Sequence, residues 1–283
     1  MIDETAAEIR DLQTHSSSVV SVKAAEALTE LCGREFGSVE EFLRSLERNS
    51  SALRRANSSH VSLQQTQQDL VSRVEDADPE TVMEAKEATQ AAVTAIVEEI
   101  ESAKAEAASA LAARISDGDT LLTHDYSTTV IGAIERATSD GKELDVYTTE
   151  ARPRFMGRRA ARRLGTVAGV ETTLITDGAA GVYMDDCDYV AVGMDCIVDD
   201  TLHNRVGTYA LATMAADQGV DFVTAGTEAK VRDGQFRFEN DFRATSEVIR
   251  EPPEGFAVNN PAYDATPMRL VDYVVTEDGV EER

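Results

Sequence analysis

Apolar residues recur at helical spacing through the first third of the chain. Ser16–Ser18 and Ser38 are typical helix caps, and each precedes an apolar stripe. After a polar stretch, Asp78 opens a long Ala- and Glu-rich pattern that reaches about Arg114. We therefore predict an N-terminal helical domain over residues 1–115. The stripes comprise Val19, Val22, Leu28 and Leu31, then Phe42 and Leu43, and finally Val82, Ala85, Ala92, Ile96 and Ile100, with the polar stretch at Asn49–His60.

From residue 116 onward, short β-rich runs alternate with amphipathic helices. This alternation is typical of a Rossmann-like, mostly parallel, doubly wound sheet, so the chain is predicted to be an α/β protein with its second domain over residues 116–283. The predicted strands are Thr120–Thr123, Leu144–Thr148, Thr172–Thr176, Tyr189–Val192, Asp221–Thr224 and Tyr273–Thr276. The predicted helices are Ser127–Ala137, Gly157–Ala168, Gly178–Asp185 and Arg205–Gln218. Glu251–Pro267 carries four prolines and is expected to be an ordered loop.

Charge changes the picture of what the protein binds. The 52 acidic and 27 basic side chains give a net charge of −25, which argues against general binding of nucleic acid or anionic lipid. The basic residues are 22 Arg and only 5 Lys, as expected for a protein kept soluble in concentrated salt. An ordinary acidic protein is the alternative.

Several classes of protein are disfavoured by what the chain lacks. It has no apolar run long enough for a membrane span and no signal-peptide pattern at Met1, so we expect a cytoplasmic protein. Its three cysteines suggest neither a disulfide framework nor a zinc site, and its histidines show no metal spacing. Gly178–Gly181 is too short for a dinucleotide fingerprint, and there is no P-loop. We therefore expect neither a metal nor a cofactor. The cysteines are Cys32, Cys187 and Cys196.

Candidate chemistry follows the predicted strands, because ligands bind beyond the carboxyl ends of a doubly wound sheet. Asp125 and Asp195 are the carboxylates expected to face each other there, and closely spaced carboxylates cannot both ionise cheaply, so one is expected to serve as an acid. For Asp125 the alternative is a helix cap. We interpret His124 as a hydrogen-bonded residue at a strand end in preference to a ligand. Ser127 and Glu150 lie on the same rim as candidate substrate contacts.

Six of the arginines lie between Arg152 and Arg163. Arg152 leaves a strand end just ahead of a predicted helix, which is a favourable place for an anion. The four arginines within that helix are expected to form a solvated face paired with surface acids. They are Arg158, Arg159, Arg162 and Arg163.

Five motifs, taken in order, resemble the family of the alpha, beta and delta subunits of translation initiation factor 2B. This family includes methylthioribose-1-phosphate isomerase and archaeal ribose-1,5-bisphosphate isomerase. The resemblance covers nearly the whole chain, and the low Lys content suggests a haloarchaeal member. The motifs are Thr123–Val130, Thr149–Pro153, Asp177–Ala180, Gly193–Ile197 with Asn204–Tyr209, and Asn260–Pro267.

The resemblance implies a sugar-phosphate pocket between the two domains and a homo-oligomer, either a dimer or a ring of dimers. The isomerases use a cysteine and an aspartate as their acid–base pair. Asp195 matches the aspartate, and Asp125 stands where the thiol is expected.

Two further stretches depart from the isomerase pattern. Thr14–Ser18 replaces an Arg-Gly-Ala phosphate loop. The pairs that lie near the sugar in the isomerases become Asp199-Asp200 and Asn204-Arg205, and carboxylates beside a phosphate are repulsive.

These departures favour one hypothesis, a translation initiation factor 2B subunit-like protein that binds a phosphorylated sugar or AMP in a regulatory or scaffold role, with an initiation factor as a further partner. The alternative is a ribose-1,5-bisphosphate isomerase-type enzyme acting on a sugar 1-phosphate. In that enzyme Asp195 and Asp125 share the proton transfers, while Arg152, Asn204 and Arg205 hold phosphate and hydroxyl groups.

Overall fold

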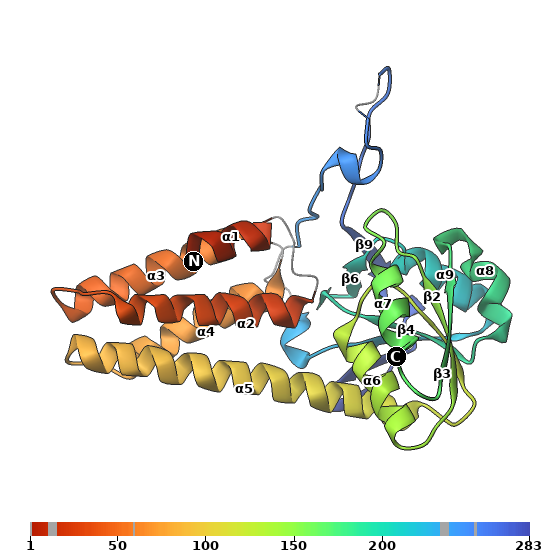
Figure 1. The fold of residues 1–283 in the computed structure, drawn as a ribbon, viewed down its shortest axis with the longest axis horizontal. Helices are drawn as coiled ribbons and strands as arrows, with labels where there is room; N and C mark the ends of the chain where they lie inside the picture. The colour runs from red at the N-terminus through yellow and green to blue at the C-terminus, as the bar shows by residue number, and fades with distance from the viewer. Residues whose placement is uncertain (1, 11–15, 59, 233–237, 252–253) are drawn as a thin grey trace. The chain divides into compact units, whose positions relative to one another are not determined.

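The computed structural model describes residues 2–10, 16–58, 60–232, 238–251 and 254–283 (Figure 1). The chain divides into two compact units, Met1–Ser102 and Ala103–Arg283. The division falls within the longest helix, α5 (Val82–Arg114), which therefore contributes residues to both units.

The N-terminal unit is helical, as its apolar spacing predicts. Ser38 caps α3 by accepting a hydrogen bond from the Glu41 amide at 3.2 Å, as expected from the sequence. The sequence analysis placed the start of the polar stretch too early, at Asn49. Helix α3 continues beyond that residue and buries Leu53. On α2 the buried residues include Val20, in place of the predicted Val19 and Val22. The other helices of the unit are α1 (Ile2–Arg10), α2 (Ser17–Leu28), α3 (Val39–Ala56) and α4 (Val61–Asp76), with a 3-10 turn at Thr29–Gly33.

The C-terminal unit is built on a seven-stranded sheet of order β11-β10-β7-β4-β1-β2-β3. All neighbouring strands are parallel except β10 and β11. Numbering the six parallel strands along the chain gives the doubly wound order 3-2-1-4-5-6, which confirms the predicted fold class. The strands are β1 (Thr120–Thr123), β2 (Leu144–Thr149), β3 (Val170–Ile175), β4 (Tyr189–Gly193), β7 (Asp221–Ala225), β10 (Tyr273–Thr276) and β11 (Gly279–Glu282).

Helices cover both faces of this sheet (Figure 1). In β1, Leu121 packs with α6, α7 and the last turns of α5, while Leu122 packs on the opposite face with α8 and α9. Because successive strand residues point to opposite faces, apolar residues in unbroken runs bury both sides. The helices are α6 (Thr128–Ser139), α7 (Met156–Leu164), α8 (Ala180–Tyr183) and α9 (Thr208–Gln218), with 3-10 turns at Asp177–Ala179, Met184–Asp186, Glu228–Lys230, Thr245–Glu247 and Met268–Leu270.

A second sheet, of order β8-β5-β6-β9, was not predicted. Its strands are short, and the two polar strands β6 and β9 pair residues far apart in the chain, such as Arg205 with Tyr263. The helix predicted from Arg205 therefore begins only at Thr208, and the end of the proline-rich stretch is a strand in place of a loop. The strands are β5 (Cys196–Val198), β6 (Thr201–Arg205), β8 (Val231–Arg232) and β9 (Tyr263–Pro267).

None of the helices among the described residues combines the length and the apolar character that a membrane crossing requires.

Gly157 provides a test of how closely α7 approaches β2. A Cβ atom added at Gly157 would lie 1.7 Å from the Thr149 carbonyl oxygen, so Gly157→Ala must push the helix away from the strand end. We expect a loss of about 2 kcal/mol or more in the free energy of unfolding, measured by urea titration. Gly178→Ala is the control, because nothing lies within 4 Å of its added Cβ, and it should change stability by less than about 0.5 kcal/mol. Equal effects of the two substitutions would contradict this packing.

Candidate functional site

Two carboxylates and one guanidinium meet where the strand order reverses, between β1 and β4. Asp125 follows β1 and Asp195 follows β4, and Arg205 Nε lies 3.5 Å from Oδ2 of each aspartate. All three side chains are 16–17% exposed, so the cluster is largely shielded from solvent. The structure thus brings together three of the residues selected from the sequence.

Arg205 changes the electrostatics expected for the pair of aspartates. The repulsion between the two carboxylates is offset here by a cation that they share. Burial disfavours the charged form of Arg205, but Tyr263, Asp195 and Asp125 together outweigh it and raise the pKa of the guanidinium. Burial also raises the pKa of Tyr263 to about 12, with Arg205 acting in the opposite direction. Arg205 is therefore a permanent positive charge, and Tyr263 a neutral hydrogen-bonding group.

The backbone around Asp125 aims it at this cluster. Asp125 adopts a left-handed conformation, with φ of 62°, which is uncommon outside glycine but tolerated by Asp. The cap of α6 is Ser127, whose hydroxyl accepts a hydrogen bond from the Val130 amide at 3.3 Å. The alternative interpretation of Asp125 as a helix cap is therefore wrong.

Ser127 also packs closely against the end of β4. A Cβ atom added at Gly193 would lie 2.7 Å from Ser127 Oγ, so glycine is needed at the end of β4. Ser127, a candidate substrate contact, thus borders the cluster while also capping its helix.

A buried lysine binds the backbone just before Asp195, and the sequence analysis missed it. Lys230 is 6% exposed and donates a hydrogen bond to the Met194 carbonyl at 2.9 Å. An added Cβ at Gly226 would lie 2.4 Å from Met194 Cγ, so the segment before Asp195 is held tightly. The available signal was the scarcity of lysine in the chain, which makes each retained lysine notable.

Cys196, next to Asp195, does not replace the thiol that Asp125 displaces. It is 1% exposed, and burial together with the Asp195 charge raises its pKa to about 12. A thiol with so high a pKa stays neutral and is a poor nucleophile or base.

His124 is a structural residue, as the sequence interpretation held. Its Nδ1 lies 2.6 Å from Thr149 Oγ1, and its Nε2 lies 2.8 Å from the Val206 carbonyl oxygen. A carbonyl can only accept, so Nε2 carries the proton and Nδ1 accepts from Thr149. Gly207, with φ of 114°, packs against the ring, where an added Cβ would lie 2.6 Å from Nε2.

The N-terminus of α9 is already occupied by a carboxylate of the chain. Asp264 Oδ2 accepts hydrogen bonds from the amides of Gly207 at 2.6 Å and Tyr209 at 3.0 Å. Asn204, a candidate substrate contact, is 5% exposed and donates its amide to Thr208 Oγ1 at 3.0 Å. Asn204 therefore precedes Arg205 of the cluster in the chain, but its side chain binds Thr208 in place of a cluster residue.

The remaining candidates follow β2. The amide of Arg152 donates to Asp177 Oδ2 at 2.7 Å, and its guanidinium donates to the Val248 carbonyl at 3.3 Å. Glu150 accepts from Arg158 at 2.7 Å. Arg163 similarly pairs with Glu135 at 2.6 Å, which confirms the expected solvated face of α7 for these two arginines.

One departure from the isomerase pattern, the pair Asp199-Asp200, looks different in the structure. Asp199 and Asp200 form the exposed tip of the β5–β6 hairpin, roughly 10 Å along the strand from Asp195, so they do not crowd a phosphate at the cluster. Thr14 and His15 lie outside the described residues.

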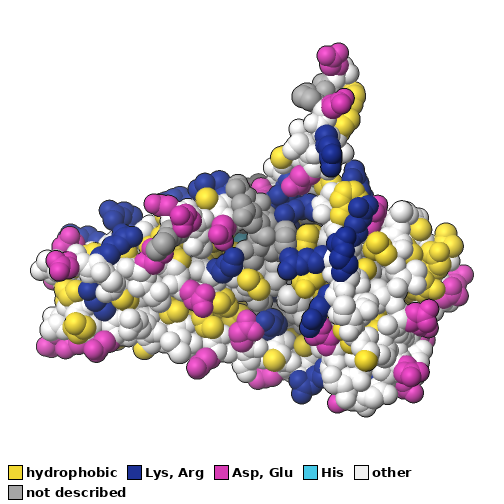
Figure 2. Space-filling view, in the orientation of Figure 1, with side chains coloured by type: hydrophobic (Ala, Val, Ile, Leu, Met, Phe, Trp, Pro, Cys, Tyr) yellow, Lys and Arg dark blue, Asp and Glu magenta, His cyan; other side chains and the backbone are white. Residues whose placement is uncertain are grey.

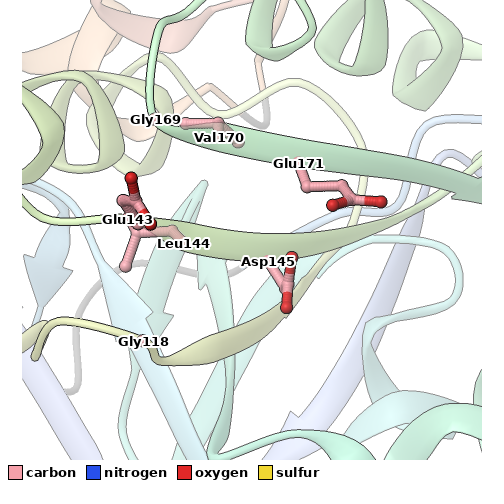
Figure 3. A pocket seen from close by; sticks show the side chains of 7 residues that line it. All are labelled: Gly118, Glu143, Leu144, Asp145, Gly169, Val170 and Glu171. Atoms are coloured by element: carbon pink, nitrogen blue, oxygen red, sulfur yellow. The ribbon is translucent and has the colours of Figure 1, made fainter.

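A separate pocket lies at the opposite edge of the sheet, at the amino ends of β1, β2 and β3 (Figure 3). Its polar lining consists of three carboxylates, and such a lining repels a phosphate ester. It is lined by Gly118, Glu143, Leu144, Asp145, Gly169, Val170 and Glu171. Among the residues that the structure describes, no three His, Cys, Asp or Glu side chains are grouped so as to hold a metal ion.

Comparisons with known proteins place this geometry in context. The model of the initiation factor 2 subunit family matches residues 13–282. Ribose 1,5-bisphosphate isomerase from Haloterrigena turkmenica is 32% identical over 97% of this chain and 88% of its own length. The same-named protein of Haloferax volcanii is 31% identical over 98% and 88%. The crystal structure of translation initiation factor eIF-2B subunit delta from A. fulgidus superimposes with a TM-score of 0.81 at 26% identity, covering 99% of this chain and 87% of that one.

These relatives overturn the preferred functional hypothesis from the sequence. A regulatory or scaffold protein without turnover is wrong as the main interpretation, because the relatives that match almost the whole chain at 31–32% identity are named ribose 1,5-bisphosphate isomerase. The hypothesis relied on Asp125 in the thiol position and on the missing Arg-Gly-Ala loop, and Thr14 and His15 of the stretch that replaces this loop lie outside the described residues. Asp199 and Asp200, which argued against a phosphate, lie away from the cluster.

Lys230 leads to a test of the charge behind Asp195. Burial lowers the pKa of Lys230 below its usual 10.5. Between the lowered value and 10.5 the unfolded chain binds more proton than the folded one, so this group's contribution to the free energy of unfolding rises with pH. Lys230→Met removes that dependence. The wild-type advantage over Lys230→Met should therefore grow as the pH rises toward 10.5, by at most about 1.4 kcal/mol per pH unit.

Urea unfolding at fixed KCl concentration and several pH values measures this slope. Lys23→Met, which removes an exposed lysine of the helical unit, serves as the control. A difference between wild type and Lys230→Met that stays constant with pH would contradict the buried ammonium.

Proposed function

The chain belongs to the initiation factor 2 subunit family, and from that premise we propose that it is an aldose–ketose isomerase of C1-phosphorylated pentoses, with ribose 1,5-bisphosphate as the substrate. The observation that carries the proposal is the pair of shielded aspartates held on Arg205 at the reversal of the strand order. The full-length similarity to enzymes of that name supports it.

The reaction needs two proton transfers and one hydrogen shift within the sugar. An acid protonates the ring oxygen as its bond to C1 breaks. The hydrogen on C2 moves to C1 with its electron pair, and a base takes the proton of the C2 hydroxyl, so that C2 becomes a carbonyl. The atoms balance within one substrate molecule, because one proton enters and one leaves. Two neighbouring carboxyl groups can provide the acid and the base.

We assign these roles to the aspartates of the cluster. Asp195 and Asp125 are the acid–base pair, and Arg205 holds both in place while presenting positive charge to the phosphate on C1. Arg152 is a further phosphate contact at the end of β2.

The remaining candidate contacts are proposed to orient the sugar hydroxyls. Ser127 borders the cluster, while Asn204 and Glu150 must exchange their bonds to Thr208 and Arg158 to reach a ligand. Partial shielding of the cluster strengthens these contacts because the local dielectric is low.

The setting proposed for this activity is a cytoplasm rich in salt. The 5 Lys among 27 basic residues and the net charge of −25 support a halophilic archaeal protein. We also propose that it works as a homo-oligomer, a dimer or a ring of dimers, in line with the family resemblance.

The activity itself is the first test. Purified protein in about 2 M KCl should convert ribose 1,5-bisphosphate to the 2-ketose bisphosphate, detected by phosphorus NMR. Asp195→Asn should lower kcat by about 10²- to 10⁴-fold, since it removes one acid–base group. Asp221→Asn, an exposed carboxylate at the amino end of β7, is the matched control and should keep wild-type activity. No turnover by the folded wild type across phosphorylated pentoses would overturn the proposal.

Salt dependence of stability tests the proposed setting. Raising KCl from about 0.2 M to about 3 M screens the repulsion among the acidic side chains, so the midpoint of thermal unfolding should rise by more than about 5 °C. Sucrose, which is excluded from protein surfaces without screening charge, provides the comparison and should raise it less. A midpoint that sucrose raises as much as KCl does would argue against salt adaptation.

A further inference from the structure

Tyr263 connects Arg205 to the second sheet. The two residues are partners in the register of β6 and β9, so their side chains leave the same face of the sheet. Arg205 Cζ lies 4.8 Å from the centre of the Tyr263 ring, and a hydrogen bond between the two side chains helps to raise the pKa of the guanidinium. Because a guanidinium can only donate, the phenol oxygen of Tyr263 accepts this bond. Tyr263 is 4% exposed, so the contact is shielded from water.

The segment between β8 and β9 fixes both the backbone and the ring of Tyr263. Asn240 Nδ2 donates to the Tyr263 carbonyl at 2.8 Å, and the Tyr263 amide donates to Asn240 Oδ1 at 3.2 Å. The ring of Phe238 meets that of Tyr263 edge to face, with 5.3 Å between ring centres, and stacks on His203 at 3.9 Å. These contacts leave the Tyr263 side chain little freedom to change its orientation.

This segment is itself anchored where it leaves the small sheet. Figure 2 shows its far end standing out from the C-terminal unit, while Lys and Arg side chains gather around its foot. The Ala262 amide donates to the Asp241 carbonyl at 2.8 Å, which joins the two arms of the segment. Arg243 donates to Glu247 at 2.6–3.0 Å, and Asn260 donates to the same carboxylate at 3.1 Å. The part of the segment that reaches Tyr263 is therefore fixed.

Arg205 is the charge that this arrangement controls. Its guanidinium contacts both aspartates, and it is also the group that is bonded to the Tyr263 side chain. A change at Tyr263 can therefore alter the electrostatics of the pair through Arg205. Other titratable groups also interact electrostatically with the pair, namely Arg154 with Asp125, and Lys230, Cys196 and Tyr263 itself with Asp195.

We propose that Tyr263 is a positioning residue of the isomerase, whose hydroxyl holds Arg205 on the two aspartates. Asn240 and Phe238 hold Tyr263 in turn. This assignment rests on the proposed function. Without the phenol oxygen, one N–H group of Arg205 loses its acceptor in a shielded place, and the guanidinium can turn away from the carboxylates. The pair then loses part of the positive charge that offsets its repulsion.

Tyr263→Phe tests this role, because it removes the hydroxyl and keeps the ring in contact with Phe238. Tyr209→Phe, which removes a hydroxyl from a side chain of α9 that is 45% exposed, is the matched control. Turnover of ribose 1,5-bisphosphate in about 2 M KCl, followed from about pH 5 to pH 9, gives kcat/KM and its acid limb for each variant. Circular dichroism confirms that each variant is folded.

Tyr263→Phe should lower kcat/KM by about 10-fold, because a small displacement of the group that holds the acid–base pair is costly. A positive charge held on a carboxylate favours its ionised form, so the acid limb should move to higher pH by at least about 0.5 unit. Tyr209→Phe should match the wild type. Wild-type kinetics in Tyr263→Phe would overturn the proposal. A fall in kcat/KM with an unmoved acid limb would also overturn it, because Tyr263 would then serve packing alone.

Asn240→Ala tests the part played by the segment between β8 and β9. The substitution frees the backbone of Tyr263 and leaves the hydroxyl in place. The acid limb should therefore move in the same direction as in Tyr263→Phe, by a smaller amount. An acid limb that stays at the wild-type position in Asn240→Ala would overturn the role of the segment.

A double-mutant cycle on unfolding keeps this inference separate from the isomerase proposal. Urea titration compares the wild type, Tyr263→Phe, Arg205→Met and the double variant, and Arg205→Gln replaces Arg205→Met if the latter does not fold. The effect of Tyr263→Phe on the unfolding equilibrium constant should be at least about 3-fold smaller once Arg205 has been replaced. Such coupling in a protein without turnover would support the contact that positions Arg205 and reject the enzyme. Turnover without coupling would keep the enzyme and overturn the positioning role.

Discussion

The arrangement of the C-terminal unit centres on one guanidinium shared by two carboxylates. Asp125 and Asp195 arrive from strands that are neighbours in the sheet and 70 residues apart in the chain, and their repulsion in a shielded place requires a cation. Arg205 can serve only because β6 pairs with β5, which directly follows Asp195, and with β9, which brings Tyr263 alongside. The small second sheet therefore supports the candidate site. Lys230 adds a second buried positive charge behind the same strand end.

Charge is distributed with a clear division between surface and interior. Most of the acidic excess lies on the surface, where salt screens it, while buried or half-buried cations serve particular carboxylates and carbonyls. Arg205, Arg243 and Lys230 have defined partners in the interior. Arg158 and Arg163 of α7 also pair with carboxylates, but their side chains are exposed to solvent. Arginine suits the shared positions because its planar group can hold two carboxylates at once and remains charged when desolvated.

Much of the fold could be predicted because local patterns carried it. β1 and β10 have the predicted bounds, and the other predicted strands differ by one or two residues, since each is a short apolar run buried on both faces. The long helix was correctly ended at Arg114. The second sheet could not be predicted, because β6 and β9 are polar, and their pairing depends on residues nearly sixty positions away. For the same reason Asp264, Glu247 and Lys230 were missed, although Asp264 lay within a recognised motif.

The sequence by itself determined the layered α/β architecture, the family resemblance and the pair Asp125 and Asp195, because the carboxyl ends of adjacent parallel strands must meet at one edge. Only the tertiary structure decided what those aspartates face. In the structure Arg205 lies between them. Ser127 is the helix cap, and Asp199 and Asp200 lie at the tip of a hairpin away from the cluster. The physical reason is that periodicity reports which face of an element is buried, whereas the partner of a charge is set by long-range pairing between strands. The expected repulsion between a phosphate and Asp199-Asp200 was inferred from their place in the sequence, and in the folded structure these residues lie away from the site.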